Sequence, residues 1–147
     1  MTSLQDIAQQ YVALVLATGQ HDPDYVDAYY GPPEWKAEAE AAPQSLADLQ
    51  AQAEQLQQRL ASLGRDPGPR GDVREAEMLG LRKAYLKKQT GALRTRLAML
   101  SGTRMPFDEE SLALYDAAVR ERTEEEFRTV LEALSRLLSG AGSVLDR

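Results

Sequence analysis

The chain lacks cysteine, has a single histidine and a single tryptophan, and contains no long apolar run. Without cysteine it can form no disulfide, thiolate metal site or iron–sulfur cluster, and it has no cysteine nucleophile. One histidine, His21, excludes a His-Glu-x-x-His zinc motif within these residues. No apolar stretch approaches the ~20 residues of a membrane span, and the N-terminus lacks a signal-peptide pattern. We therefore expect a cytoplasmic location and no membrane association.

The composition is that of a globular protein with a core of its own. The 147 residues are 43% hydrophobic and 27% charged, and the net charge is −6. This length fits one domain, and the apolar content is too high for a disordered chain. An acidic chain argues against bulk nucleic-acid binding, so we expect no nucleic-acid partner.

Apolar residues recur every three or four positions along almost the whole chain, which predicts helices and gives no sign of strands. Ser45 with Asp48, and Thr123 with Glu126, are candidate N-terminal caps. We predict an all-α helical bundle of about five to seven helices. The expected helices cover approximately residues 3–18, 22–30, 34–42, 46–63, 73–100, 107–120 and 124–138.

A central long antiparallel helical hairpin is predicted over residues 45–101. In its first helix, Leu46 to Leu63, the apolar positions alternate three and four apart; in its second, leucines repeat every seven residues from Leu79 to Leu100. The breaker-rich stretch 64–71 predicts the turn between them. We expect a single domain, 1–147, that consists of N-terminal helices with an aromatic segment (1–42), the hairpin (45–101), C-terminal helices (107–138) and a flexible tail (139–147).

The segment 21–35 concentrates residues that can carry function. It holds the only histidine and tryptophan, together with three of the six tyrosines. Aromatic rings with polar tips are typical of ligand surfaces and interfaces, but they also fill corners between helices. All three interpretations stay open for the candidate ligand-facing residues of this segment, which are His21, Tyr25, Tyr29, Tyr30 and Trp35.

The charged runs favour structural roles. The acidic runs 108–110 and 124–126 stand at expected helix N-termini, where the helix dipole favours them, and consecutive helical residues cannot converge on a cation. The stretch from Arg82 to Arg104 has seven basic residues and no acid. We expect it to form a solvated face that neutralises an acidic neighbour.

No phosphate loop, dinucleotide fingerprint or complete catalytic constellation is found, so no catalytic or metal-ligating residue is assigned.

The run His21-Asp22-Pro23-Asp24-Tyr25-Val26-Asp27-Ala28-Tyr29-Tyr30-Gly31-Pro32-Pro33-Glu34-Trp35 resembles the opening of a group of bacterial zinc-metallopeptidase-like proteins. Residues 15–19, 92–102 and 107–110 fit the same pattern in the same order. In that mostly helical family the zinc ligands and the catalytic glutamate lie downstream, beyond the position that corresponds to residue 147. The resemblance thus implies no cofactor in this chain, and a helical region that helps to form or cover a peptide cleft, with residues 29–31 facing it.

Three functional hypotheses follow. The first is a non-catalytic helical region whose partner is the catalytic domain of a metallopeptidase-like protein. The second is a stand-alone interaction module, such as a homodimer through the leucine seams, which Leu56→Glu or Leu86→Glu would dissociate. The third is a small enzyme or ligand carrier with a pocket lined by the four aromatic residues of the segment 21–35.

Overall fold

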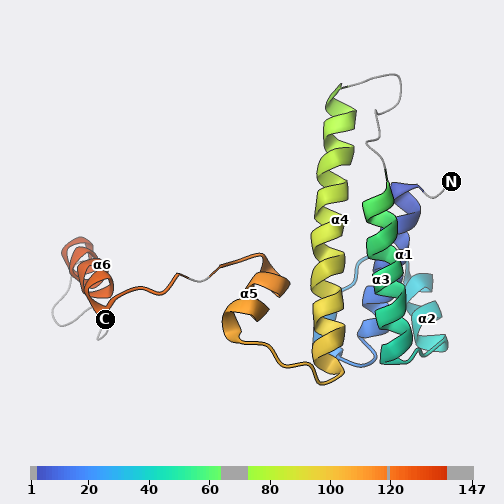
Figure 1. The fold of residues 1–147 in the computed structure, drawn as a ribbon, viewed down its shortest axis with the longest axis horizontal. Helices are drawn as coiled ribbons and strands as arrows, with labels where there is room; N and C mark the ends of the chain where they lie inside the picture. The colour runs from blue at the N-terminus through green and yellow to red at the C-terminus, as the bar shows by residue number, and fades with distance from the viewer. Residues whose placement is uncertain (1–2, 64–72, 119, 139–147) are drawn as a thin grey trace. The chain divides into compact units, whose positions relative to one another are not determined.

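The computed structural model describes residues 3–63, 73–118 and 120–138, and all regular structure within them is helical. The predicted all-α class is therefore confirmed. Figure 1 shows the order of the elements, which are α1 (Leu4–Thr18), the 3₁₀ turn η1 (Pro23–Tyr25), α2 (Pro33–Ala41), α3 (Leu46–Ser62), α4 (Val73–Leu100), α5 (Phe107–Tyr115) and α6 (Glu124–Leu137).

The chain divides into two compact units, residues 1–117 and 118–147. The first contains α1 to α5, and the second contains α6. The sequence predicts one domain over the same residues, whereas the structure sets those after Ala117 apart as a unit of their own. The predicted turn at 64–71 and the predicted tail at 139–147 lie outside the described residues.

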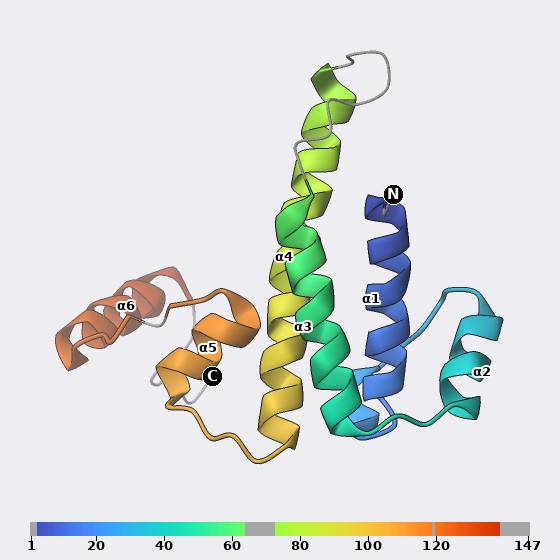
Figure 2. The same cartoon turned by 45° about the vertical axis from the view of Figure 1, so that its right-hand side comes forward.

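The first unit is organised around the predicted hairpin. Helices α3 and α4 run antiparallel and pack along their length, as Figures 1 and 2 both show. Helix α1 packs against both of them, while α2 packs on α1 and α5 packs on α4. At one end of the hairpin, the Gln50 side chain of α3 donates to the Leu97 carbonyl and to Ser101 Oγ, at 3.1 Å each.

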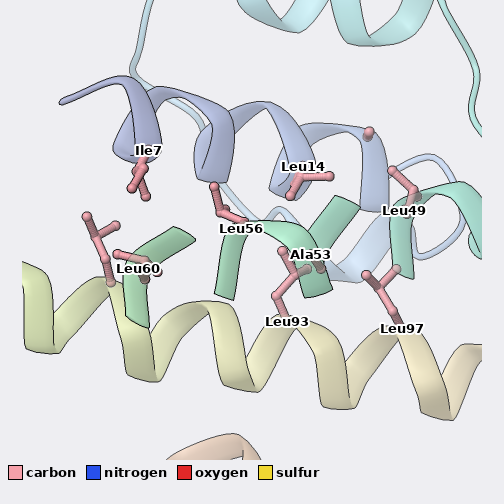
Figure 3. Packing of buried hydrophobic residues seen from close by; sticks show 10 residues of the cluster. Ile7, Leu14, Leu49, Ala53, Leu56, Leu60, Leu93 and Leu97 are labelled. Carbon is pink, nitrogen blue, oxygen red and sulfur yellow. The ribbon is translucent and has the colours of Figure 1, made fainter. Parts of the chain in front are cut away.

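The core is a three-helix seam in which α3 lies between α1 and α4 (Figure 3). The α3 residues that face inward are four and three apart, which matches the predicted coiled-coil spacing. Fully buried side chains of this kind exclude water and supply most of the driving force for folding. The core residues are Ile7, Leu14 and Ala17 from α1, Leu49, Ala53, Leu56 and Leu60 from α3, and Leu86, Leu93 and Leu97 from α4.

Helix α4 is much longer than its partner. It has 28 residues against 17 in α3, which corresponds to about 42 and 26 Å. Its first turns project beyond α3 (Figures 1 and 2). The seven-residue leucine repeat is therefore buried at Leu86 and Leu93, whereas Leu79 and Leu100 are only half-buried.

The helix predicted over residues 22–30 is wrong. Only the single turn η1 forms, closed by the Tyr25 N–H, which donates to the Asp22 carbonyl at 3.0 Å. An aspartate directly before a proline is a favourable N-cap, but the Asp22 carboxylate makes no capping hydrogen bond and instead accepts from Arg96 of α4. The ion pair with Arg96 thus occupies the Asp22 carboxylate, which would otherwise have to cap a helix that begins at Pro23.

Helix α5 ends at Tyr115 instead of near Arg120. Asp116 adopts the left-handed conformation, with φ 56°, and its N–H donates to the Leu112 carbonyl. Aspartate is among the few residues that tolerate this conformation, which terminates a helix. The Ser111 hydroxyl then donates to the Ala117 carbonyl at 2.9 Å and secures the turn.

The predicted helix caps at Ser45 and Thr123 are confirmed. The Ser45 hydroxyl accepts from the Asp48 N–H at 3.1 Å, and Thr123 with Glu126 forms a complete capping box at the start of α6. Helix α4 ends at Leu100, as the expected range 73–100 predicts. Gly102, just after it, has φ 98°, and the Thr103 N–H donates to the Ala98 carbonyl. In the described residues, no helix is long and apolar enough to cross a membrane.

Candidate functional site

The segment 21–35 does not fold into a single aromatic cluster. His21 is exposed, and its Nε2 lies 2.7 Å from the Gln44 carbonyl oxygen. Tyr29 donates to the Pro32 carbonyl at 3.2 Å, and Tyr30 is 96% exposed. Trp35 is half-buried in the first turn of α2. Tyr25 alone among these residues packs against the hydrophobic core.

Tyr25 also lines a hollow of about 340 Å³ in the first unit, which we call the Asp22–Arg96 hollow. Residues of η1 and its flank meet α4 and the end of α5 here, although they lie far apart in the sequence. His21, Tyr29, Tyr30 and Trp35 are not among the lining residues, so the hollow differs from the expected aromatic pocket. Its lining consists of Asp22, Asp24, Tyr25, Gln89, Ala92, Arg96, Leu114 and Tyr115.

An ion pair forms the floor of this hollow. The Nε and NH2 atoms of Arg96 both lie 2.7 Å from Asp22 Oδ2, across 74 positions of sequence. Asp22 is only 8% exposed, and the Arg96 side chain is 33% exposed. The Asp22 N–H donates to the Thr18 carbonyl at 3.1 Å, so the end of α1 holds the carboxylate in place.

The neighbouring tyrosines keep their hydroxyl groups neutral. Burial raises the pKa of Tyr25, an effect to which the Asp22 carboxylate adds and which Arg96 opposes. Burial likewise raises the pKa of Tyr11 on α1, whose hydroxyl donates to Gln89 Oε1 at 3.2 Å. This hydrogen bond ties α1 to the part of α4 that lines the hollow.

The residues that line the hollow form no recognisable catalytic constellation. The hollow contains no histidine, serine, threonine or lysine, and its arginine is committed to a carboxylate. A general base or nucleophile would need a partner within hydrogen-bond reach, which this lining does not provide. In the part of the chain that the structure describes, no group of three or more His, Asp or Glu residues could hold a metal ion.

The first unit also exposes an apolar face on the N-terminal half of α4. Met78, Leu81 and Tyr85 are spaced three and four residues apart, which places them on one face of the helix. Each is more than half exposed, and so is Val73 at the start of the helix. Three further apolar residues are exposed on α5, namely Phe107, Leu112 and Tyr115.

The second unit carries an apolar stripe of its own. Helix α6 has acids in its first turn and arginines at i+4 from its glutamates, as in the Glu124–Arg128 pair at 3.1 Å. The apolar side chains recur at helical spacing along one side of it. All of them are exposed, and they are Phe127, Val130, Leu131, Leu134, Leu137 and Leu138.

Sequence reasoning missed most of the hollow. It noted Asp22 and Asp24 as acids of the segment 21–35, and it predicted that the basic stretch of α4 would neutralise acids. The structure pairs Arg96 with Asp22, Arg94 with Glu54 and Lys88 with Asp116. No local signal marks Gln89 or Leu114, which line the hollow only once α4 has packed against α1 and α5 against α4.

Comparisons with known proteins found no match: no family model, no curated protein and no solved structure is similar to this chain.

Proposed function

We propose that this chain is the non-catalytic, N-terminal helical region of a zinc-metallopeptidase-like protein, where it helps to form or cover a peptide cleft. The resemblance of the segment 21–35 to such proteins motivates the proposal. Zinc and the catalytic glutamate would belong to a different region of that protein. The role of this chain is then to dock, and any peptidase activity would need the catalytic region.

The observation that carries the proposal is the apolar face of α4. A helix inside a folded monomer turns its apolar residues to the core, yet Met78, Leu81 and Tyr85 of α4 remain more than half exposed. They line a shallow apolar hollow with Leu79. Exposed apolar surface of this kind marks a site of contact with another polypeptide.

The exposed Tyr30 and the half-buried Tyr29 support the same role. Tyr30 projects into solvent, and Tyr29 is held by Pro32 beside it. Tyrosine is favoured at interfaces because its ring is apolar and its hydroxyl is polar. A turn that presents two tyrosines fits an element that faces a cleft or a second domain.

A zinc titration of the purified chain tests the proposal. We expect less than about one-tenth zinc per chain after dialysis, because the zinc ligands belong to the catalytic region. Replacing Met78, Leu81 and Tyr85 by glutamine should also lower the binding of an apolar fluorescent dye without loss of helix content. Stoichiometric zinc in the chain alone, or dye binding unchanged by the substitutions, would overturn the proposal.

A second candidate is a stand-alone interaction module, and the apolar stripe of α6 favours it. Such a helix can pair with a partner helix or with a second copy. The leucine seam expected to serve a homodimer is unavailable, because Leu56 and Leu86 lie in the core of the first unit. Substitutions there would unfold the chain. The relevant test is sedimentation equilibrium, in which Leu131→Glu or Leu134→Glu should abolish any concentration-dependent mass.

A further inference from the structure

The lining of the Asp22–Arg96 hollow includes one carboxylate without a partner, that of Asp24. Arg96 is neutralised by Asp22, since two of its nitrogens bond the same carboxylate oxygen. Lys88 and Asp116, each next in sequence to a lining residue, pair with one another. Asp24, which is among the lining residues, has no hydrogen-bond or ion-pair partner among the described residues. The lining therefore carries a net charge of −1.

Two tyrosines line the hollow together with Asp24. Tyr25 lines the hollow with its ring packed against the core, and Tyr115 lines it from the end of α5. The faces of aromatic rings attract cations, and an arginine guanidinium also stacks on them because it is flat. Ala92 and Leu114 complete an apolar wall, along which the methylene groups of a long basic side chain can lie.

We propose that the Asp22–Arg96 hollow binds the side chain of an arginine presented by another polypeptide. The guanidinium would bond the Asp24 carboxylate and stack against the tyrosine rings. The hollow, of about 340 Å³, falls in the size range of sites that accept small ligands. Arginine suits this lining better than lysine, because its planar fork matches a carboxylate and its weaker hydration lowers the cost of stacking.

Backbone-capped tripeptides test this inference on the 147-residue chain alone. The result does not depend on whether the proposed function is correct. The probe is acetyl-Gly-Arg-Gly-amide, and the matched control is the same peptide with citrulline, which keeps the shape and removes the charge. Amide NMR spectra should show saturable shifts at Tyr25, Arg96 and Leu114 with the arginine peptide. A millimolar Kd is expected for a single side chain.

Two substitutions localise the binding. Asp24→Asn should weaken binding of the arginine peptide at least about fivefold, since it removes the unpaired charge. Asp27→Asn is the control, because Asp27 is an exposed acid of the same segment outside the lining, and it should leave the Kd unchanged. Equal binding of the citrulline peptide would overturn the inference. So would a Kd unaffected by Asp24→Asn, or an absence of saturable shifts at the hollow.

Discussion

At the scale of single residues, Asp22 explains why the chain after α1 forms a single 3₁₀ turn instead of a longer helix. Its carboxylate is almost fully buried and holds two nitrogens of Arg96, so it cannot cap a helix at Pro23. A buried charge is tolerated only when it is paired in this way. The same contact supplies the floor of the hollow and leaves Asp24 as its unpaired charge. One side chain thus shapes both the local fold and the candidate site.

Thr90 is a second residue with a measurable consequence. It is fully buried in α4, and its hydroxyl has no hydrogen-bond partner among the described residues. Thr90→Val replaces the hydroxyl by a methyl group of similar size. We expect it to raise the free energy of unfolding by about 1 kcal/mol, because the buried hydroxyl loses its bonds to water without replacement. Urea unfolding followed by circular dichroism measures this.

The matched control is Thr18→Val. Thr18 is equally buried, but its hydroxyl donates to the Leu14 carbonyl at 2.8 Å. Removing a satisfied donor should lower the free energy of unfolding by about 0.5–1.5 kcal/mol. If the two valine variants destabilise the chain to the same extent, the account of Thr90 is wrong.

At the scale of elements, local signals predicted most helix bounds. Caps such as Ser45 and Thr123, and the stop at Gly102, act within a few residues and can be read from the sequence. The helices at 22–30 and 107–120 were mispredicted, because their limits depend on the contacts of Asp22 with Arg96 and of Asp116 with Lys88. Such contacts join residues that no local pattern connects.

Helix α4 contains two glycines that its packing does not require. A Cβ atom at Gly80 or at Gly91 would meet nothing within 4 Å. Alanine is favoured over glycine in a helix by up to about 1 kcal/mol. Gly80→Ala and Gly91→Ala should therefore each raise the free energy of unfolding, with a smaller gain at Gly80, which lies nearer the end of the helix. Chemical denaturation monitored by circular dichroism measures both.

Gly102→Ala should have the opposite effect. Gly102 closes α4 with φ 98°, a conformation that disfavours any side chain. We expect a loss of about 1 kcal/mol in the free energy of unfolding. A stabilising Gly102→Ala, or destabilising changes at both Gly80 and Gly91, would contradict this reading of the helix.

At the scale of the whole molecule, the sequence predicts the hairpin and its core because the leucine spacing repeats over many residues. It does not predict the hollow, since Arg96 and Gln89 reach Tyr25 only after α4 packs against α1. Nor does it predict which apolar residues stay exposed. That depends on how far α4 extends past α3, and this is set only when the two helices pack together. The proposed docking role rests on the exposed apolar face of α4.

The most direct test of that role is the mass and zinc content of the natural protein that contains this sequence. It can be purified from its own cells with an antibody raised against the first unit. The account predicts a polypeptide or a tight complex heavier than 16.3 kDa, with about one zinc per copy of this sequence. A free, zinc-less product of 16.3 kDa would contradict it and would favour the stand-alone interaction module.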